Sequence, residues 1–138
     1  MMPVLFINSR GVPYVDLIGR RQKTLETRSK DMLRSLSDSW ILIAETGSGT
    51  PVVKALAFLG QGFPVRSRKE WDRLRPAHLV PEGSRYDWSA STVVKWLYSV
   101  SCAVQLPHPF TLPADSVRHG RTWAELDTDN LDLLLQNA

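Results

Sequence analysis

The chain has 138 residues, of which 43% are apolar and one is a cysteine, so it predicts a single domain (residues 1–138) and excludes an internal disulfide bond and a multi-cysteine zinc site. No apolar run reaches the roughly 18–20 residues of a membrane helix, and the first residues lack the basic lead of a secretion signal, so we expect a soluble, cytoplasmic protein. The net charge of +3 is uneven, because residues 1–75 hold 13 Lys and Arg against 7 Asp and Glu (+6) and residues 76–138 hold 4 against 7 (−3), which suits a phosphate-bearing partner.

The N-terminal part predicts one strand and two short helices. The apolar run Val4–Ile7 indicates a strand, and Pro13 then opens a helix that ends at Gly19. Ser29 can cap a second short helix. The side chains of that helix that we expect to face inward are Met32, Leu33 and Leu36.

The segment between these two helices, residues 19–28, carries the densest opposite charge of the sequence. If a strand begins at Thr24, alternation places on one face Thr24, Glu26 and Arg28, and on the other Leu25 and Thr27. Lys23, at the turn, can reach over the first face. Two interpretations are open: a solvated edge strand whose ion pairs are weak, or the wall of a pocket.

The middle of the chain predicts two buried strands and a capped helix. Residues 40–44 form a continuous apolar run, as expected for a strand covered on both faces. Residues 52–59 predict a second apolar strand, in which Lys54 is the one charged residue. Ser67 and Glu70 match a capping box that opens a helix, which we expect Pro76 to terminate. A loop is expected over residues 81–91.

The clearest period lies in residues 94–106, where apolar side chains occupy every second position and predict a long, half-buried strand. The same pattern predicts that Cys102 is buried. We expect Pro107 and Pro109 to end this strand, a short strand over residues 122–126 and a closing helix over about residues 129–137. The sequence therefore predicts an α+β fold, with a strongly curved sheet or small β-barrel and short peripheral helices.

The charged segment resembles the signature of the ASCH domain family, which has a PUA-like fold. The resemblance rests on Gly19, Lys23, Glu26 and Arg28, in a pattern where lysine, glutamate and arginine follow the first helix. Residues 52–61 and 95–109 are similar to later strands of the family, so the resemblance covers about residues 4–126. The gap between Gly19 and Lys23 is longer than the single residue usual in the family.

The resemblance implies a cleft lined by the lysine, glutamate and arginine, in a family associated with RNA and nucleosides. Some bacterial members remove the acyl group from N(4)-acetylcytidine, others are described as ribonucleases, and others bind nucleic acid. In the amidohydrolases a threonine three residues after the lysine is the nucleophile. Glu26 stands at that position here, so the threonine mechanism does not transfer unchanged.

The residues present allow three roles for this segment. Glu26 can be a general base on water, its pKa raised by partial burial, while Lys23 or Arg28 stabilises the oxyanion. Alternatively, Thr24 or Thr27 is a nucleophile that Lys23 deprotonates. Strand alternation favours the first. In a third interpretation, Glu26 and Arg28 form a buried ion pair that fixes the geometry of the corner and has no catalytic role.

Further candidates concern substrate binding. Tyr86 and Trp88 lie in a loop that can close over a ligand and stack on a base, and we expect Arg28 and Arg21 to contact the substrate. The three histidines lack metal-ligand spacing, so we expect no metal and no cofactor. The leading hypothesis is a metal-independent hydrolase of an N(4)-acylated cytidine or a similar modified nucleoside. The alternatives are a non-catalytic RNA-binding module and a ribonuclease.

Overall fold

In the computed structural model, which describes residues 1–129 and 131–132, seven strands form one mixed sheet in the order β2-β5-β4-β3-β1-β7-β6. β1 and β3 pair in parallel, and the other five pairings are antiparallel. The strands are β1 (Met2–Asn8), β2 (Leu25–Arg28), β3 (Ser39–Thr46), β4 (Val52–Val65), β5 (Lys95–Thr111), β6 (Val117–His119) and β7 (Trp123–Leu126).

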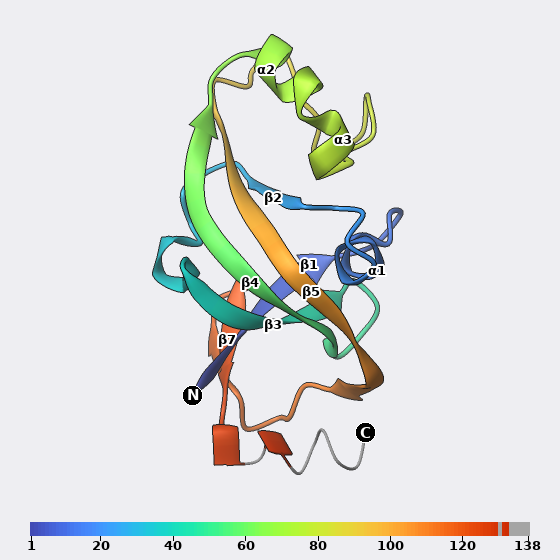
Figure 1. The fold of residues 1–138 in the computed structure, drawn as a ribbon, viewed down its shortest axis with the longest axis vertical. Helices are drawn as coiled ribbons and strands as arrows, with labels where there is room; N and C mark the ends of the chain where they lie inside the picture. The colour runs from blue at the N-terminus through green and yellow to red at the C-terminus, as the bar shows by residue number, and fades with distance from the viewer. Residues whose placement is uncertain (130, 133–138) are drawn as a thin grey trace.

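Short helices lie around this sheet. They are α1 (Tyr14–Gly19), the 3₁₀ helix η1 (Arg34–Leu36), α2 (Arg68–Arg73) and α3 (Arg75–His78). Figure 1 shows α2 and α3 together at one end of the long, bent strands β4 and β5, with β2 between these helices and α1. The predicted α+β fold with a curved sheet is confirmed, and the sheet does not close into a barrel. None of the helices in the described part of the chain is long and apolar enough to cross a membrane.

The prediction of a helix after Ser29 is wrong, because the segment between Ser29 and β3 contains only the three-residue 3₁₀ helix η1. The hydroxyl of Tyr98 donates a hydrogen bond to Asp31 at 2.5 Å and accepts one from the amide of Leu33 at 3.3 Å. These contacts with β5 hold the segment in an irregular conformation, an example of tertiary structure overriding local propensity. Leu33 and Leu36 are buried as expected, whereas Met32 is exposed.

The capping box is present, since the Ser67 side chain accepts a hydrogen bond from the amide of Glu70 at 3.2 Å. Pro76 does not terminate the helical segment as predicted. It lies in the first turn of α3, where the missing amide hydrogen of proline costs no helical hydrogen bond. The closing helix predicted for about residues 129–137 lies largely outside the described residues.

Strand β5 differs from the prediction at two irregularities in its pairing with β4. Between the pairs Phe58↔Ser101 and Leu56↔Val104, β5 has two residues where β4 has one, and Cys102 there adopts a positive φ of 52°. The bulge inverts the alternation, so Cys102 is exposed and Ala103 is buried in its place. The prediction that Cys102 is buried is therefore wrong.

The prolines do not end β5, which continues to Thr111. Pairing with β4 jumps from Ala55↔Gln105 to Val53↔Phe110, so Pro107 and Pro109 lie in a stretch without regular pairing. A proline is tolerated there because no ladder hydrogen bond needs its missing amide hydrogen.

One apolar cluster joins the sheet to the helices at its end. Its buried members are Leu25, Val65, Trp71, Val80 and Leu97. We call residues 68–94, which contain α2, α3 and the following loop, the helical lobe. Because this cluster packs the helical lobe against β2 and β5, the lobe faces the charged segment.

Candidate functional site

The end of α1 and the start of β2 place the charged segment. The chain turns through Arg21, whose φ is 62°, and the amide of Lys23 then donates to the carbonyl of Leu17 at 3.1 Å. The next residue, Thr24, is fixed on both sides, because its amide bonds the carbonyl of Ala77 and its carbonyl accepts the amide of Val100. β2 then pairs with β5, which sets Glu26 opposite Tyr98 and Arg28 opposite Trp96.

Lys23 is a buried lysine, with 1% of its surface exposed. Its Nζ donates a hydrogen bond to the carbonyl oxygen of His78, lies 3.9 Å from Glu26 Oε1, and stands 4.8 Å from the ring centroid of Tyr14. Burial lowers the pKa of Lys23 to about 8, although the charge of Glu26 acts in the opposite direction. A lysine with such a pKa can both donate and accept a proton near neutral pH.

The buried carboxylate of Glu26 lies between two cations. Its Oε2 is 3.0 Å from Arg28 Nη2, and its Oε1 accepts a hydrogen bond from the amide of Thr27 at 3.0 Å. Arg28 Nη2 also donates to the carbonyl of Phe6 in β1 at 3.1 Å. The guanidinium therefore bridges β2 to β1 and holds the carboxylate of Glu26, and the ion pair that the third interpretation expected is present.

These side chains open into a cavity of about 290 Å³. Four charged residues line it, namely Lys23, Glu26, Arg28 and Lys95. Four hydroxyl-bearing residues also line it, namely Tyr14, Thr27, Ser29 and Tyr86. The remaining lining residues are Ile7, Asn8, Met32 and Val80. The volume lies near the lower end of small-molecule sites, which is about 300 Å³.

The structure brings together in this cavity five of the predicted site residues, Lys23, Glu26, Thr27, Arg28 and Tyr86. Thr27 was expected on the opposite face of β2 and nevertheless lines the cavity. Three others do not line it. Thr24 is exposed, Arg21 donates to the carbonyl of Ala103 at 2.9 Å, and Trp88 packs near Trp71 with ring centroids 6.4 Å apart.

The sequence did not predict the other seven residues that line the cavity, which are Ile7, Asn8, Tyr14, Ser29, Met32, Val80 and Lys95. Tyr14 lies in the helix predicted between Pro13 and Gly19, where an aromatic residue is also typical of a core, and Lys95 falls between the apolar positions of the strand predicted over residues 94–106. The hydroxyl of Tyr14 has a pKa raised by burial and then by the charge of Glu26. No local sequence signal marks Val80.

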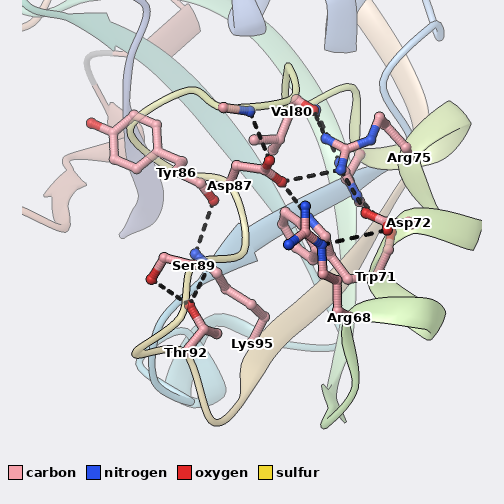
Figure 2. Close-up of polar contacts among 12 residues, drawn as sticks. Arg68, Trp71, Asp72, Arg75, Val80, Tyr86, Asp87, Ser89, Thr92 and Lys95 are labelled. Atoms are coloured by element: carbon pink, nitrogen blue, oxygen red, sulfur yellow. Dashed lines mark hydrogen bonds and ion pairs between the residues drawn. The ribbon is translucent and has the colours of Figure 1, made fainter.

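The helical lobe is held by a buried carboxylate, Asp87, which Figure 2 shows among its partners. Asp87 accepts hydrogen bonds from Trp71 Nε1 at 2.7 Å, from Gly83 N at 2.8 Å and from Arg75 Nη2 at 3.1 Å. Burial alone would raise the pKa of Asp87, but these bonds hold it well below its usual range. The network fixes the loop that carries Tyr86.

His78 links the helical lobe to Lys23. Its ring stacks on Trp71 with centroids 3.9 Å apart, its Nδ1 accepts the amide of Val80 at 2.9 Å, and its Nε2 lies 3.0 Å from the carbonyl of Trp71. Since Nδ1 accepts, we assign the proton of the neutral ring to Nε2. Burial lowers the pKa of His78 to about 4. A neutral His78 thus orients both the Val80 wall and the carbonyl that binds Lys23.

Comparison with known proteins identifies the fold. The ASCH protein from Zymomonas mobilis superposes with a TM-score of 0.73 at 16% sequence identity, over 98% of this chain and 94% of that one. The chain has the fold of the ASCH proteins. Two mutants of the Z. mobilis ASCH protein, one serine-to-alanine and one tyrosine-to-phenylalanine, each give a TM-score of 0.72 at 16% identity and cover 99% and 98% of this chain and 95% and 96% of theirs. No protein-family model and no curated protein sequence matches the chain.

The similarity confirms the predicted ASCH fold and leaves the activity to be argued from the cavity of this chain. In this chain the Nζ atom of the buried Lys23 lies 3.9 Å from Oε1 of the buried Glu26. Such a pair can move a proton to and from a bound substrate. In the described residues no group of three or more His, Cys, Asp or Glu side chains is placed to hold a metal ion.

Proposed function

We propose that this chain is a hydrolase that removes the acyl group from the exocyclic amine of an N(4)-acylated cytidine or a similar modified nucleoside. The observation that carries the proposal is the pairing of Lys23 and Glu26 in a cavity of about 290 Å³, near the lower end of small-molecule sites. Burial lowers the pKa of Lys23 to about 8, so its amine can give a proton to a substrate and take one back near neutral pH.

The proposed reaction uses a water molecule as the nucleophile. Glu26 accepts a proton from the water as its oxygen attacks the acyl carbon, and Arg28 and the Lys23 ammonium stabilise the oxyanion that forms. The carbon–nitrogen bond then breaks as Lys23 donates a proton to the exocyclic nitrogen. Glu26 returns its proton to Lys23, and the products are the nucleoside and a carboxylic acid.

Thr24 does not line the cavity, so Thr27 is the threonine that remains as an alternative to a water nucleophile. Thr27 lines the cavity, and its backbone amide donates to Glu26 Oε1 at 3.0 Å. Replacing Thr27 by valine separates the two mechanisms. If water is the nucleophile, turnover survives in Thr27→Val. If Thr27 is the nucleophile, Thr27→Val loses turnover and an acyl-enzyme can be trapped in the wild type.

A second candidate function is RNA binding, without chemistry or with ribonuclease activity. It is favoured by the net charge of +6 on residues 1–75 and by the exposure of Arg20 and Arg21 beside α1. RNA binding predicts an affinity that falls steeply with salt concentration and drops when both arginines are replaced. Cleavage of an RNA oligonucleotide would identify the ribonuclease, and an intact oligonucleotide would identify the binding module.

The experiment for the hydrolase is incubation of the purified chain with N(4)-acetylcytidine, followed by chromatography of the released cytidine. We expect turnover that falls by about 100-fold or more in Lys23→Met and in Glu26→Gln, the usual size of a lost acid–base group. Lys69→Met is the matched control, since Lys69 is an exposed lysine of α2 that does not line the cavity. Absence of cytidine release, or release that both cavity variants leave unchanged, would overturn the proposal.

A further inference from the structure

The cavity has more positive charge than its own residues neutralise. Three cations, Lys23, Arg28 and Lys95, line it together with one carboxylate, Glu26, which leaves a formal excess of two positive charges. Glu26 is close to the first two cations, at 3.9 Å from Lys23 and 3.0 Å from Arg28. Lys95 is the cation that Glu26 does not reach. The charge of Asp87 acts on Lys95, but Asp87 lies beyond ion-pair distance and is itself paired with Arg75 at 3.1 Å, so the ammonium can accept a further anionic partner.

Lys95 is a partly buried lysine whose close partners carry no negative charge. Its Nζ donates to the carbonyl of Tyr86 at 2.9 Å and lies 5.3 Å from the ring centroid of Trp71. Figure 2 shows the dashed line that joins Lys95 to the carbonyl of Tyr86 in the loop of the helical lobe. Within residues 1–129 and 131–132, no carboxylate oxygen lies within 4.0 Å of this ammonium. The Tyr86 carbonyl uses one of the three ammonium donors, and the other two can serve a ligand.

A second hollow, of about 280 Å³, adjoins the first and shares Lys95 and Ser29 with it. Its remaining lining residues are Ser91, Thr92, Val93 and Val94. Three hydroxyls gather at this loop, since Ser89 Oγ lies 3.1 Å from both Ser91 Oγ and Thr92 Oγ1. A lysine and the hydroxyl-bearing residues Ser29, Ser91 and Thr92 thus line one hollow, and an ammonium with hydroxyl donors suits phosphate oxygens.

We infer that the ligand of the cavity carries a phosphate group, which Lys95 binds in the second hollow with the hydroxyls of Ser29, Ser91 and Thr92. This inference rests on the proposed function for the nucleoside part of the ligand. The base and its acyl group then occupy the cavity at Lys23 and Glu26, and the phosphate extends past Lys95. The phosphate belongs either to a mononucleotide or to the backbone of an RNA strand.

The first test is equilibrium binding of cytidine, cytidine 5′-monophosphate and cytidine 3′-monophosphate by titration calorimetry. We expect at least one monophosphate to bind about tenfold or more tightly than cytidine, and inorganic phosphate to compete with it. Lys95→Met should remove this difference, Lys95→Arg should retain it, and Lys69→Met should leave it unchanged. Equal affinity of the wild type for cytidine and both monophosphates would overturn the inference for mononucleotides.

The second test distinguishes the two sources of phosphate. It compares binding of the monophosphates with binding of a short cytidine-containing RNA oligonucleotide, each to the wild type, Lys95→Met and Thr92→Val. If the monophosphates gain affinity through Lys95, the phosphate belongs to a nucleotide. If only the oligonucleotide gains affinity, the phosphate belongs to RNA. If neither the monophosphates nor the oligonucleotide show a gain in affinity that depends on Lys95, the inference is wrong. Thr92→Val tests the same hollow if Lys95→Met fails to fold.

Binding and hydrolysis can fail independently. If N(4)-acetylcytidine is hydrolysed no less efficiently than its 5′-monophosphate and no phosphate-dependent binding is seen, the inference is wrong and the proposed function stands. If neither acylated compound is hydrolysed but the phosphate-dependent binding is present and requires Lys95, the proposed function is wrong and the phosphate site stands.

Discussion

At the scale of single residues, the proposed chemistry depends on a lysine that the fold removes from water. The ammonium of Lys23 keeps a backbone carbonyl, an aromatic face and one carboxylate as partners in place of solvent. The sequence predicted that Lys23, Glu26 and Arg28 lie near one another, because strand alternation puts residues 26 and 28 on one side. It did not predict that Thr24 stays outside the cavity, because contacts with Ala77 and Val100 fix that residue before β2 begins.

The burial of Lys23 predicts a stability that depends on pH. Its pKa of about 8 in the folded chain is below its ordinary value of 10.5, so the unfolded chain binds more protons between these pH values. The contribution of Lys23 to the unfolding free energy should therefore rise from pH 8 to pH 10.5, by on the order of 3 kcal/mol. Urea unfolding of the wild type and of Lys23→Met across this range isolates the effect. A difference between the two proteins that stays constant with pH would contradict the prediction.

At the scale of elements, the helical lobe supplies part of the cavity wall. It contributes Val80 and Tyr86, and it contacts Lys95 at the start of β5. The sequence predicted the capped start of α2 and the loop over residues 81–91. It did not predict that Asp87 fixes this loop. In the sequence Asp87 is an ordinary charged loop residue, and it meets its partners in α2 and α3 only when the chain folds.

The neutral ring of His78 predicts that the lobe is sensitive to acid. Its pKa is about 4 in the folded chain against an ordinary 6.5, so the unfolded chain binds more protons in this window and stability falls as pH decreases from 6.5 to 4. The loss from His78 should be on the order of 3 kcal/mol. His78→Asn has no ring to protonate, so the difference between its unfolding free energy and that of the wild type should shrink over this range. A difference that grows with acidification would be the opposite of the expected result.

At the scale of the whole molecule, the curved pairing of β4 with β5 connects the sheet to the site. An apolar segment predicted β4, the alternation of residues 94–106 predicted β5, and the ASCH resemblance predicted their place in the fold. The bulge at Cys102 and the continuation through Pro107 could not be predicted, since both depend on the register with β4, which is a long-range property. The same pairing sets Tyr98 between Gly62 of β4 and Glu26 of β2.

The close approach at Gly62 predicts a test of this pairing. A Cβ atom on Gly62 would lie 2.5 Å from a ring carbon of Tyr98, which is fully buried. Gly62→Ala should therefore lower the unfolding free energy by about 1–3 kcal/mol, since the ring must shift within the core. Ser101→Ala, at an exposed position of β5, is the control and should change it by less than about 0.5 kcal/mol. Equal stability of Gly62→Ala and wild type in urea unfolding would show that the ring is not confined as described.

In the proposed reaction Lys23 and Glu26 act together on one substrate. The most direct measurement is kcat/KM for N(4)-acetylcytidine in Lys23→Met, Glu26→Gln and the double variant. Residues that act as a unit are not additive, so the double variant should be no more impaired than the worse single variant. Losses that multiply in the double variant would show that the two side chains act independently, and full activity in all three would show that the cavity is not the active site.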